Sequence, residues 1–367
     1  MVPSTILFVF GTRPEAIKLA PVIEELRRDA ESFTVRVCVT GQHREMLAQA
    51  LDLFGIIRDA DLGLMQPDQE LTGFAAAALT GVGRVIAATA PRVVIVQGDT
   101  TSALAGALAA FYAGVDVAHV EAGLRSGDRS APWPEEVNRR MISVLARYHF
   151  APTEEARAHL LREGATDVVV TGNPVIDMLL STRTEGVAFP ELDPARRLLL
   201  VTGHRRESFG EGLESVCLAL RDLAESVPDL EIVYPVHLNP HVQEPVRRIL
   251  AGVEHVHVID PVDYVTFVAL MHRSTLILSD SGGVQEEAPA LGKAVLLLRD
   301  TTERPEALRA GNVRMIGTQR ERIVAEAGAL LRDPARLAEM AQVRFPFGDG
   351  HAARRIAEVL RDRLRGQ

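Results

Sequence analysis

Three acidic side chains in the first half of the chain can carry acid and base chemistry. Asp99 and Glu121 come shortly after apolar runs, and Glu135 follows a Trp-Pro pair. Asp99 alone can equally cap a helix, and Glu135 alone suits a helix's first turn. Glu121 has no such structural explanation. Carboxylates gathered in one site can have their proton affinities driven apart, so that one serves as acid and another as base. We therefore expect the three to form a proton-transfer site.

A second candidate site is the stretch 276–287, LILSDSGGVQEE. The pattern indicates a buried strand, a turn containing Gly282 and Gly283, and the start of a helix. Glycines let the backbone approach a ligand closely, and the N–H groups of a helix N-terminus bind phosphate. Glu286 or Glu287 can then accept hydrogen bonds from ribose hydroxyls. An ordinary turn followed by a helix cap has the same pattern, so the motif alone leaves both interpretations open.

Basic side chains near predicted strand ends can balance the charge of a leaving diphosphate. They are Arg13, Lys18 and Arg304. Guanidinium groups bind phosphate oxygens in a bidentate manner, although arginines on helix surfaces are commonly just solvated. The chain contains two lysines, Lys18 and Lys293, and this scarcity draws attention to the one beside Arg13.

Metal and nicotinamide binding have little support in the sequence. No Cys or His pair has zinc-like spacing, and the acidic loops lack a calcium-loop pattern. Neither FGTRPE nor VTGHRRE supplies G-x-G-x-x-G. His204 and His237 each follow a predicted strand, but a lone histidine is usually structural. We therefore expect neither a metal nor NAD as a cofactor.

Length and composition indicate a soluble globular protein of two domains. The chain has 367 residues, 47% hydrophobic and 24% charged, which is too long for one comfortable core. Its net charge of −9 argues against nucleic acid, so local arginines and helix ends must attract any anionic ligand. Cys38 and Cys217 favour a reduced, cytoplasmic compartment. No signal peptide or membrane-spanning segment is evident, and we expect no membrane partner.

Apolar strands alternate with amphipathic helices along the whole chain. Strands are predicted at 6–10, 35–40, 93–96, 115–120, 148–151 and 168–171, then at 198–202, 232–235, 256–259, 276–278 and 294–298. This alternation is typical of a parallel, doubly wound α/β sheet, whose ligands bind beyond the carboxyl ends of the strands. The polar clusters described above fall there. We predict two similar domains facing each other across a cleft, at 1–172 and 173–350, and an amphipathic helix within 351–367.

The strand-end loops, taken in order, resemble the non-hydrolysing UDP-N-acetylglucosamine 2-epimerases of bacteria. The matching segments are FGTRPEAIKLAP, VTGQHREML, GDTTSALA, HVEAGLRSGDRSAPWPEEVNRR, HFAPTE, TGNPVID, TGHRRESFG, YPVHLNP, DSGGVQEEAPALGK and RDTTERPE. Each motif is modest, but an ordered series covering essentially the whole chain is highly specific. The resemblance implies two Rossmann-like domains of the glycosyltransferase-B type, an active site in the cleft, and a final helix that crosses back to the first domain.

The reaction implied by this resemblance is reversible epimerisation of UDP-N-acetylglucosamine to UDP-N-acetylmannosamine. Anti elimination of UDP across C1 and C2 would give 2-acetamidoglucal, and syn re-addition would give the product without a cofactor. The acid and the base among the carboxylates stay unassigned. The resemblance also implies a cytoplasmic homodimer that supplies cell-surface polysaccharide synthesis. The catalytic groups it implies are Asp99, Glu121, Glu135, Arg139 and His204.

Binding roles also follow from the resemblance. Bacterial members are regulated by their own substrate at a second, adjacent site, and two departures bear on binding here: Asp68 replaces an arginine, and Val262 replaces a uridine-proximal glutamine. The residues that match the second site are Gln42, Gln69, Glu135, Arg205 and His237. The residues that would hold uridine, ribose and diphosphate are Arg13, Lys18, Phe267, Ser281, Gly282, Gly283, Glu287 and Arg304.

Two other functions share some of these features. A glycosyltransferase of the same architecture would donate a sugar from UDP to an acceptor. Such an enzyme generally needs one base and an acceptor groove, whereas elimination and re-addition need proton transfer at C2. A catalytically silent nucleotide-sugar sensor would have no use for an intact Asp99, Glu121 and Glu135. The three carboxylates therefore favour the epimerase.

Overall fold

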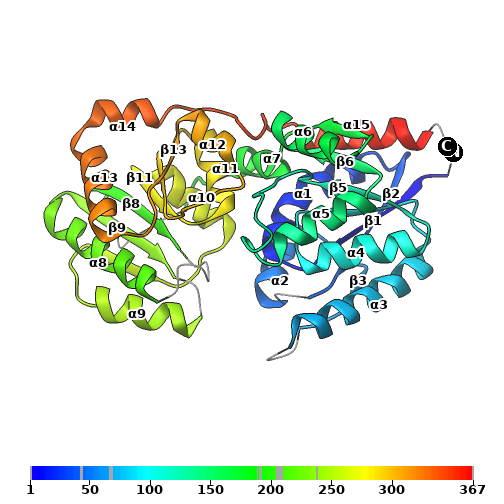
Figure 1. Ribbon diagram of the computed structural model, residues 1–367, viewed down its shortest axis with the longest axis horizontal. Helices are drawn as coiled ribbons and strands as arrows, with labels where there is room; N and C mark the ends of the chain where they lie inside the picture. Colours follow the sequence, from blue (N-terminus) through cyan, green and yellow to red (C-terminus); the bar gives the residue numbers. More distant parts are fainter. Residues whose placement is uncertain are drawn as a thin grey trace. The chain divides into compact units, whose positions relative to one another are not determined.

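The computed structural model describes residues 2–41, 44–65, 69–187, 189, 192–203, 210–236 and 239–365, without the side chains at 44–46 and 241. The chain forms two compact units (Figure 1). The first contains Met1–Ser181 together with Phe347–Gln367, and the second contains Thr182–Pro346. The first unit is therefore built from two separate stretches of the chain.

The first unit is a parallel sheet flanked by helices. Its strands are β1 (Ser4–Phe10), β2 (Phe33–Val39), β3 (Ala60–Asp61), β4 (Val93–Gln97), β5 (Asp116–Val120), β6 (Tyr148–Ala151) and β7 (Val168–Val170). Its helices are α1 (Arg13–Arg28), α2 (Arg44–Leu53), α3 (Leu71–Thr89), α4 (Thr101–Tyr112), α5 (Glu135–Leu145), α6 (Glu154–Arg162), α7 (Pro174–Ser181) and α15 (Ala352–Arg365).

The strand order of this sheet is β3-β2-β1-β4-β5-β6-β7, with parallel pairing throughout. Central strands are buried on both faces, and residues 6–10 of β1 have no exposed surface. This burial explains why the strands are continuous apolar runs. The chain reverses its direction of winding between β1 and β4. Ligands of doubly wound sheets bind at such a point, beyond the carboxyl ends of the two strands.

The second unit repeats this design. Its strands are β8 (Arg197–Thr202), β9 (Leu230–Pro235), β10 (Val256–Ile259), β11 (Leu276–Ser279), β12 (Val295–Leu297) and β13 (Val313–Met315). Its helices are α8 (Glu211–Ser226), α9 (Pro240–Leu250), α10 (Tyr264–Arg273), α11 (Gly282–Ala290), α12 (Pro305–Ala310), α13 (Arg320–Arg332) and α14 (Pro334–Met340).

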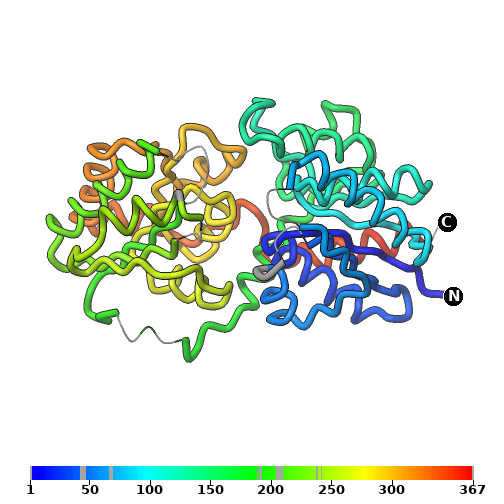
Figure 2. Tube along the Cα trace, turned by 90° about the horizontal axis from the view of Figure 1, so that it is seen from below, coloured from blue at the N-terminus to red at the C-terminus, as the bar shows by residue number. Residues whose placement is uncertain are grey.

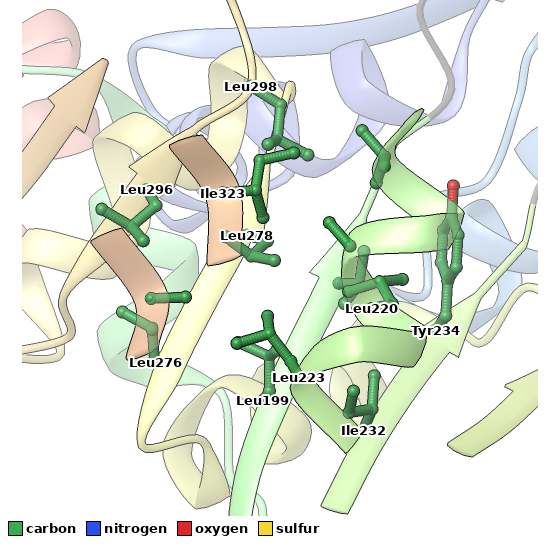
Figure 3. Close-up of a cluster of buried hydrophobic side chains, with 14 of the residues drawn as sticks. Leu199, Leu220, Leu223, Ile232, Tyr234, Leu276, Leu278, Leu296, Leu298 and Ile323 are labelled. Carbon is green, nitrogen blue, oxygen red and sulfur yellow. The ribbon is translucent and has the colours of Figure 1, made fainter. Parts of the chain in front are cut away.

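The parallel order here is β10-β9-β8-β11-β12-β13, so winding reverses between β8 and β11. The core of this unit lies between the sheet and helices α8 and α13, where Leu199, Leu220 and Ile323 pack together (Figure 3). Tyr234 is buried in the same cluster and donates a hydrogen bond to the carbonyl of Gly203 at 2.9 Å. The predicted fold class, two Rossmann-like doubly wound sheets, is confirmed.

The C-terminal segment returns to the first unit. Helix α15 packs against α1 and α7, and Figure 2 shows it in red beside the blue N-terminal part of the chain. The two stretches of chain touch where a Cβ placed on Gly172 would lie 3.0 Å from Gly348 Cα. Asp177 then accepts hydrogen bonds from the first two backbone N–H groups of α15, at 3.1 and 2.8 Å. Because α7 packs on α1, the first unit extends to Ser181, beyond the predicted boundary at residue 172.

Helix α3 is unusually apolar for a helix with so much exposed surface. It is long and apolar enough to cross a membrane by length and composition alone, although no membrane-spanning segment was expected from the sequence. Phe74, Ala78, Val82 and Ile86 form a buried stripe on it, whereas 22% of its most apolar window is buried. The stripe packs toward α4, as expected for a surface helix of a globular protein.

Candidate active site

Asp99 lies in the turn after β4, beside the point where winding reverses. The preceding Gly98 has a φ of +67°, a conformation that favours glycine. Thr100, and not Asp99, caps α4, because its hydroxyl accepts a hydrogen bond from the N–H of Ala103 at 3.0 Å. Asp99 instead forms an ion pair with Arg139 through Oδ2. The alternative explanation of Asp99 as a helix cap is therefore wrong.

Helix α5 supplies the groups that surround Asp99. Asn138 Nδ2 donates to the backbone carbonyl of Asp99 at 2.9 Å, and Arg139 is almost fully buried. Arg139 Nη1 also lies 3.3 Å from Oε2 of Glu136, itself buried. Glu135 is half-buried at the first position of the helix, one turn before Arg139 and on the same face. Helix α5 thus directs several polar side chains toward the end of β4.

Glu121 lies at the end of β5 and has a φ of +63°, which is rare for a residue other than glycine. Its carboxylate is buried and forms an ion pair through Oε2 with Nζ of Lys18. Asn173 Nδ2 donates to the same oxygen at 2.7 Å. The other oxygen, Oε1, lies 3.8 Å from the place that a Cβ on Gly98 would take. The structure therefore brings Glu121 next to the turn that carries Asp99.

His119 on β5 forms a hydrogen bond with the turn that carries Gly98 and Asp99. Its Nε2 lies 2.8 Å from the carbonyl of Gly98. Burial lowers the pKa of His119 to about 3, so the ring is neutral and Nε2–H is the donor. Nδ1 has no hydrogen-bond partner among the residues that the structure describes. A neutral histidine thus anchors the backbone just before Asp99 without adding charge.

Glu15 connects two loops of the candidate site, and sequence reasoning missed it. Its Oε2 accepts hydrogen bonds from the N–H groups of Gly11 and Thr12, at 3.0 and 2.8 Å. Its Oε1 accepts one from the hydroxyl of Thr100 at 2.7 Å. Burial raises the pKa of Glu15 to about 7. The available signal was a carboxylate within the strand-end motif GTRPE, three residues after a possible capping threonine.

The second candidate site lies at the start of α11. Ser281 is the N-cap residue, but its side chain makes no capping hydrogen bond. A Cβ on Gly282 would lie 2.8 Å from Nη1 of Arg304, so the guanidinium of Arg304 packs directly over this glycine. Arg304 also forms ion pairs with Glu286 and Glu303. An arginine and a helix N-terminus therefore meet here, an arrangement suited to an anion.

The two glutamates of α11 have different surroundings. Glu286 is fully buried and pairs with Arg304, whereas Glu287 Oε1 accepts a hydrogen bond from the hydroxyl of Tyr264 at 2.6 Å. Of the two ribose candidates, Glu287 is the one with a neutral partner. Phe267 is half-buried and follows Tyr264 by three residues on α10, so the two lie on one side of that helix.

Three further residues considered in the sequence lie at the start of a helix or in loops. Arg13 is half-buried at the first position of α1, and Gln69 and Val262 are half-buried in loops. Cys38 and Cys217 are buried and form no disulfide with each other. Within the described ranges, no group of three or more His, Cys, Asp or Glu side chains is placed to hold a metal ion. The predictions that lie outside the described residues concern Gln42, Asp68, His204, Arg205 and His237.

Comparison with known proteins connects this geometry to one family. Residues 24–361 match the family model for UDP-N-acetylglucosamine 2-epimerase. The protein of that name from Escherichia coli strain K12 is 53% identical, covering 97% of this chain and 98% of its own. The crystal structure of UDP-GlcNAc 2-epimerase from Neisseria meningitidis bound to UDP-GlcNAc is 46% identical, with a TM-score of 0.94, covering 97% of this chain and 99% of its own.

A more distant similarity bears on the fold alone. The glycotransferase of kitacinnamycin is 14% identical, with a TM-score of 0.67, and the alignment covers 99% of both chains. The glycosyltransferase-B type of architecture expected from the sequence agrees with this similarity.

Proposed function

Because this chain belongs to the UDP-N-acetylglucosamine 2-epimerase family, we propose that it interconverts UDP-N-acetylglucosamine and UDP-N-acetylmannosamine. The observation that carries the proposal is the placement of Asp99 and Glu121 beyond the ends of the adjacent strands β4 and β5, with a buried cation in contact with each. Inversion at C2 needs a proton removed and then returned, which two carboxylates in different surroundings can do. The relative from Neisseria meningitidis was crystallised with UDP-GlcNAc.

The proposed reaction proceeds by elimination and re-addition. A base takes the proton at C2, the C2–H electrons form the C1=C2 double bond, and the C1–O bond breaks to release UDP and 2-acetamidoglucal. Re-addition of UDP at C1, with a proton delivered to the opposite face of C2, completes the inversion. The substrate and the product are epimers with the same oxidation state, so the proposed reaction needs no redox cofactor. The groups assigned to this chemistry are Asp99, Glu121, Glu135, Arg139 and His204.

The second unit is proposed to hold UDP through the elimination step. Ser281, Gly282 and Gly283 supply the N-terminus of α11 for the diphosphate, and Arg304 packs over it. Glu287, oriented by Tyr264, accepts ribose hydroxyls. Phe267 completes the set proposed in this unit, and the remaining predicted binding residues are Arg13 and Lys18 on α1. This anchor matters because UDP must stay bound after its bond to the sugar has broken.

Solvent exchange at C2 tests the proposed function directly. During incubation with UDP-N-acetylglucosamine in deuterated water, deuterium should enter C2 of both epimers without net hydrolysis. Finding no deuterium there would contradict the epimerase. Glu121→Gln should abolish exchange while UDP binding stays measurable, and normal turnover by this variant would show that the carboxylate assignment is wrong. The alternative, a glycosyltransferase, would release UDP only with an acceptor and would leave C2 protonated.

Regulation by substrate is a separate proposal, based on Gln42, Gln69, Glu135, Arg205 and His237. In an assay that starts from UDP-N-acetylmannosamine, the reaction should begin after a lag. Adding UDP-N-acetylglucosamine at the start should remove this lag. A strictly hyperbolic response without activation would exclude this regulation.

The proposal extends to a homodimer formed through α3, α4 and α5. Phe111 and Tyr112 on α4 and Val144 on α5 are 57%, 71% and 85% exposed, and α3 is itself a largely exposed apolar helix. Sedimentation velocity tests the proposed homodimer, because a monomer at assay concentrations would contradict it.

A cytoplasmic enzyme of this kind would supply N-acetylmannosamine for a cell-surface polysaccharide. A gene deletion that left all such polymers unchanged would argue against that role.

A further inference from the structure

Lys18 has surroundings that differ from those of a phosphate ligand. Its side chain is 10% exposed on the inward face of α1, and its ammonium pairs with Glu121 Oε2 inside the first unit. A buried carboxylate that loses its cation carries a large desolvation penalty. For Lys18 to bind a diphosphate, its ammonium would have to leave Glu121 or share its charge with it. The geometry therefore ties this lysine to the carboxylate.

Two donors act together on the same oxygen of Glu121. Lys18 approaches from α1, and Asn173 approaches from the loop after β7 with Nδ2 at 2.7 Å from Oε2. Asn173 is itself fixed, since its Oδ1 accepts the N–H of Val175 at 3.2 Å and its own N–H donates to the carbonyl of Phe347 at 2.7 Å. Held in this way, the carboxylate presents Oε1 toward Gly98 and the turn that bears Asp99.

We propose that Lys18, assisted by Asn173, is a positioning residue that keeps Glu121 ionised and aims its second oxygen at the reacting sugar. This inference rests on the proposed function and replaces the expected role of Lys18 on the diphosphate. Two other described titratable groups close to Glu121 are His119 on β5, which is neutral, and Asp99 beyond Gly98. Neither supplies a positive charge. Lys18 does, through direct contact with this carboxylate.

The test compares Lys18→Met with Lys293→Met, since the chain has two lysines. Lys293 bonds to the carbonyls of His272 and Ser274 in the second unit and serves as the control. In Lys18→Met, ionisation of Glu121 loses its nearest cation, so the acid limb of the kcat/KM profile should move up by about one pH unit or more. The Kd for UDP should stay within about twofold, because the affected contact is internal. In Lys18→Arg, the acid limb of the kcat/KM profile should return toward the pH at which the wild type shows it. In Lys293→Met, the acid limb should stay at the wild-type pH.

Asn173→Asp is the second variant. Its Oδ1 still accepts the N–H of Val175, but an oxygen replaces the amide nitrogen beside Glu121. The acid limb should move in the same direction as in Lys18→Met. A Kd for UDP that rises about tenfold or more in Lys18→Met, or acid limbs that stay in place in both variants, would overturn the proposal.

A spectroscopic measurement separates failure of this inference from failure of the proposed function. In protein labelled at lysine, two side-chain signals are expected, and Lys293→Met assigns them. Glu121→Gln should move the Lys18 signal and leave that of Lys293 unchanged. An unmoved Lys18 signal would overturn the ion pair. If the wild type shows no exchange at C2, the proposed function fails, while the lysine spectrum still reports on the pair.

Discussion

Arg139 is a buried cation held between two carboxylates, and its removal tests the energetics of the candidate site. Its side chain is 5% exposed, and that of Glu136 is 1% exposed. Replacing Arg139 by Met leaves Glu136 buried without its cation, which should lower the free energy of unfolding by about 3–5 kcal/mol. Urea unfolding measures this change. Activity should also fall, because Asp99 loses its partner.

Arg28 provides the matched control for Arg139. It forms an ion pair with Glu24 in which both side chains are about two-thirds exposed. Solvent screens this pair, so Arg28→Met should change the free energy of unfolding by less than about 1 kcal/mol. Equal losses in the two variants would show that burial does not decide the strength of these pairs.

Glu15 should make the stability of the first unit depend on pH. Burial raises its pKa from an ordinary 4.5 to about 7, so the folded state holds a proton that the unfolded state has lost in this range. The contribution is fully present below pH 4.5 and is lost as pH rises to about 7, amounting to roughly 3 kcal/mol. Glu15→Gln keeps acceptors for Gly11 and Thr12 and should remove this slope. Thermal unfolding between pH 4.5 and 7.5 measures it, and parallel curves for the two proteins would contradict the assignment.

The residues that sequence reasoning identified and missed differ in a physical way. Asp99 and Glu121 were identifiable because a polar residue directly after an apolar strand must lie at the sheet's carboxyl edge. Asn173 and Tyr264 were missed because their importance comes from contacts with residues far along the chain. Glu15 forms a local capping box with Thr12, but its link to the second loop is equally remote. Glu15 and Thr100 are 85 positions apart, and no local pattern records such a contact.

The start of helix α11 is the element on which UDP binding is proposed to depend. An alanine at position 282 would place its Cβ 2.8 Å from Nη1 of Arg304, so the guanidinium must move away from the helix N-terminus. Gly282→Ala should therefore raise the Kd for UDP by about tenfold or more, since a charge-assisted contact is lost. Isothermal titration with UDP measures this. An unchanged Kd for UDP in Gly282→Ala would contradict the proposal that the start of α11 binds UDP.

Gly212, in the first turn of α8, is the control for this substitution. A Cβ there would lie 3.4 Å from Oγ1 of Thr318, an ordinary van der Waals contact. Gly212→Ala should leave the affinity for UDP unchanged and should slightly stabilise the helix.

At the scale of elements, strands with an apolar run were predictable and strands without one were not. Every strand predicted from an apolar run is present within a residue or two of its expected bounds. The two that were missed, β3 and β13, lie at sheet edges and contain two and three residues. The edge strands β7 and β10 were predicted because they are rich in valine and isoleucine, whereas β3 and β13 contain too few consecutive apolar residues to be recognised.

At the scale of the molecule, Asp177 fastens the last helix of the chain to the first unit. Asp177→Ala removes both backbone caps of α15 and should cost about 1–2 kcal/mol in that unit. Hydrogen exchange should rise in α15, α1 and α7, which pack together. The matched control is Asp333→Ala, which removes the cap of α14 in the second unit. Exchange that rises in the same places in both variants would contradict this description.

The discontinuous first unit has a consequence for synthesis on the ribosome. Residues 182–346 form a contiguous compact unit, whereas the unit begun by residues 1–181 also contains 347–367. Translation therefore supplies every residue of the later unit before the earlier one can be finished. Until α15 arrives, the surfaces of α1 and α7 that it covers stay uncovered, and a nascent chain exposes apolar area there. We expect chaperone binding during translation to concentrate on the amino-terminal portion and to end once α15 has been synthesised and has packed on α1 and α7.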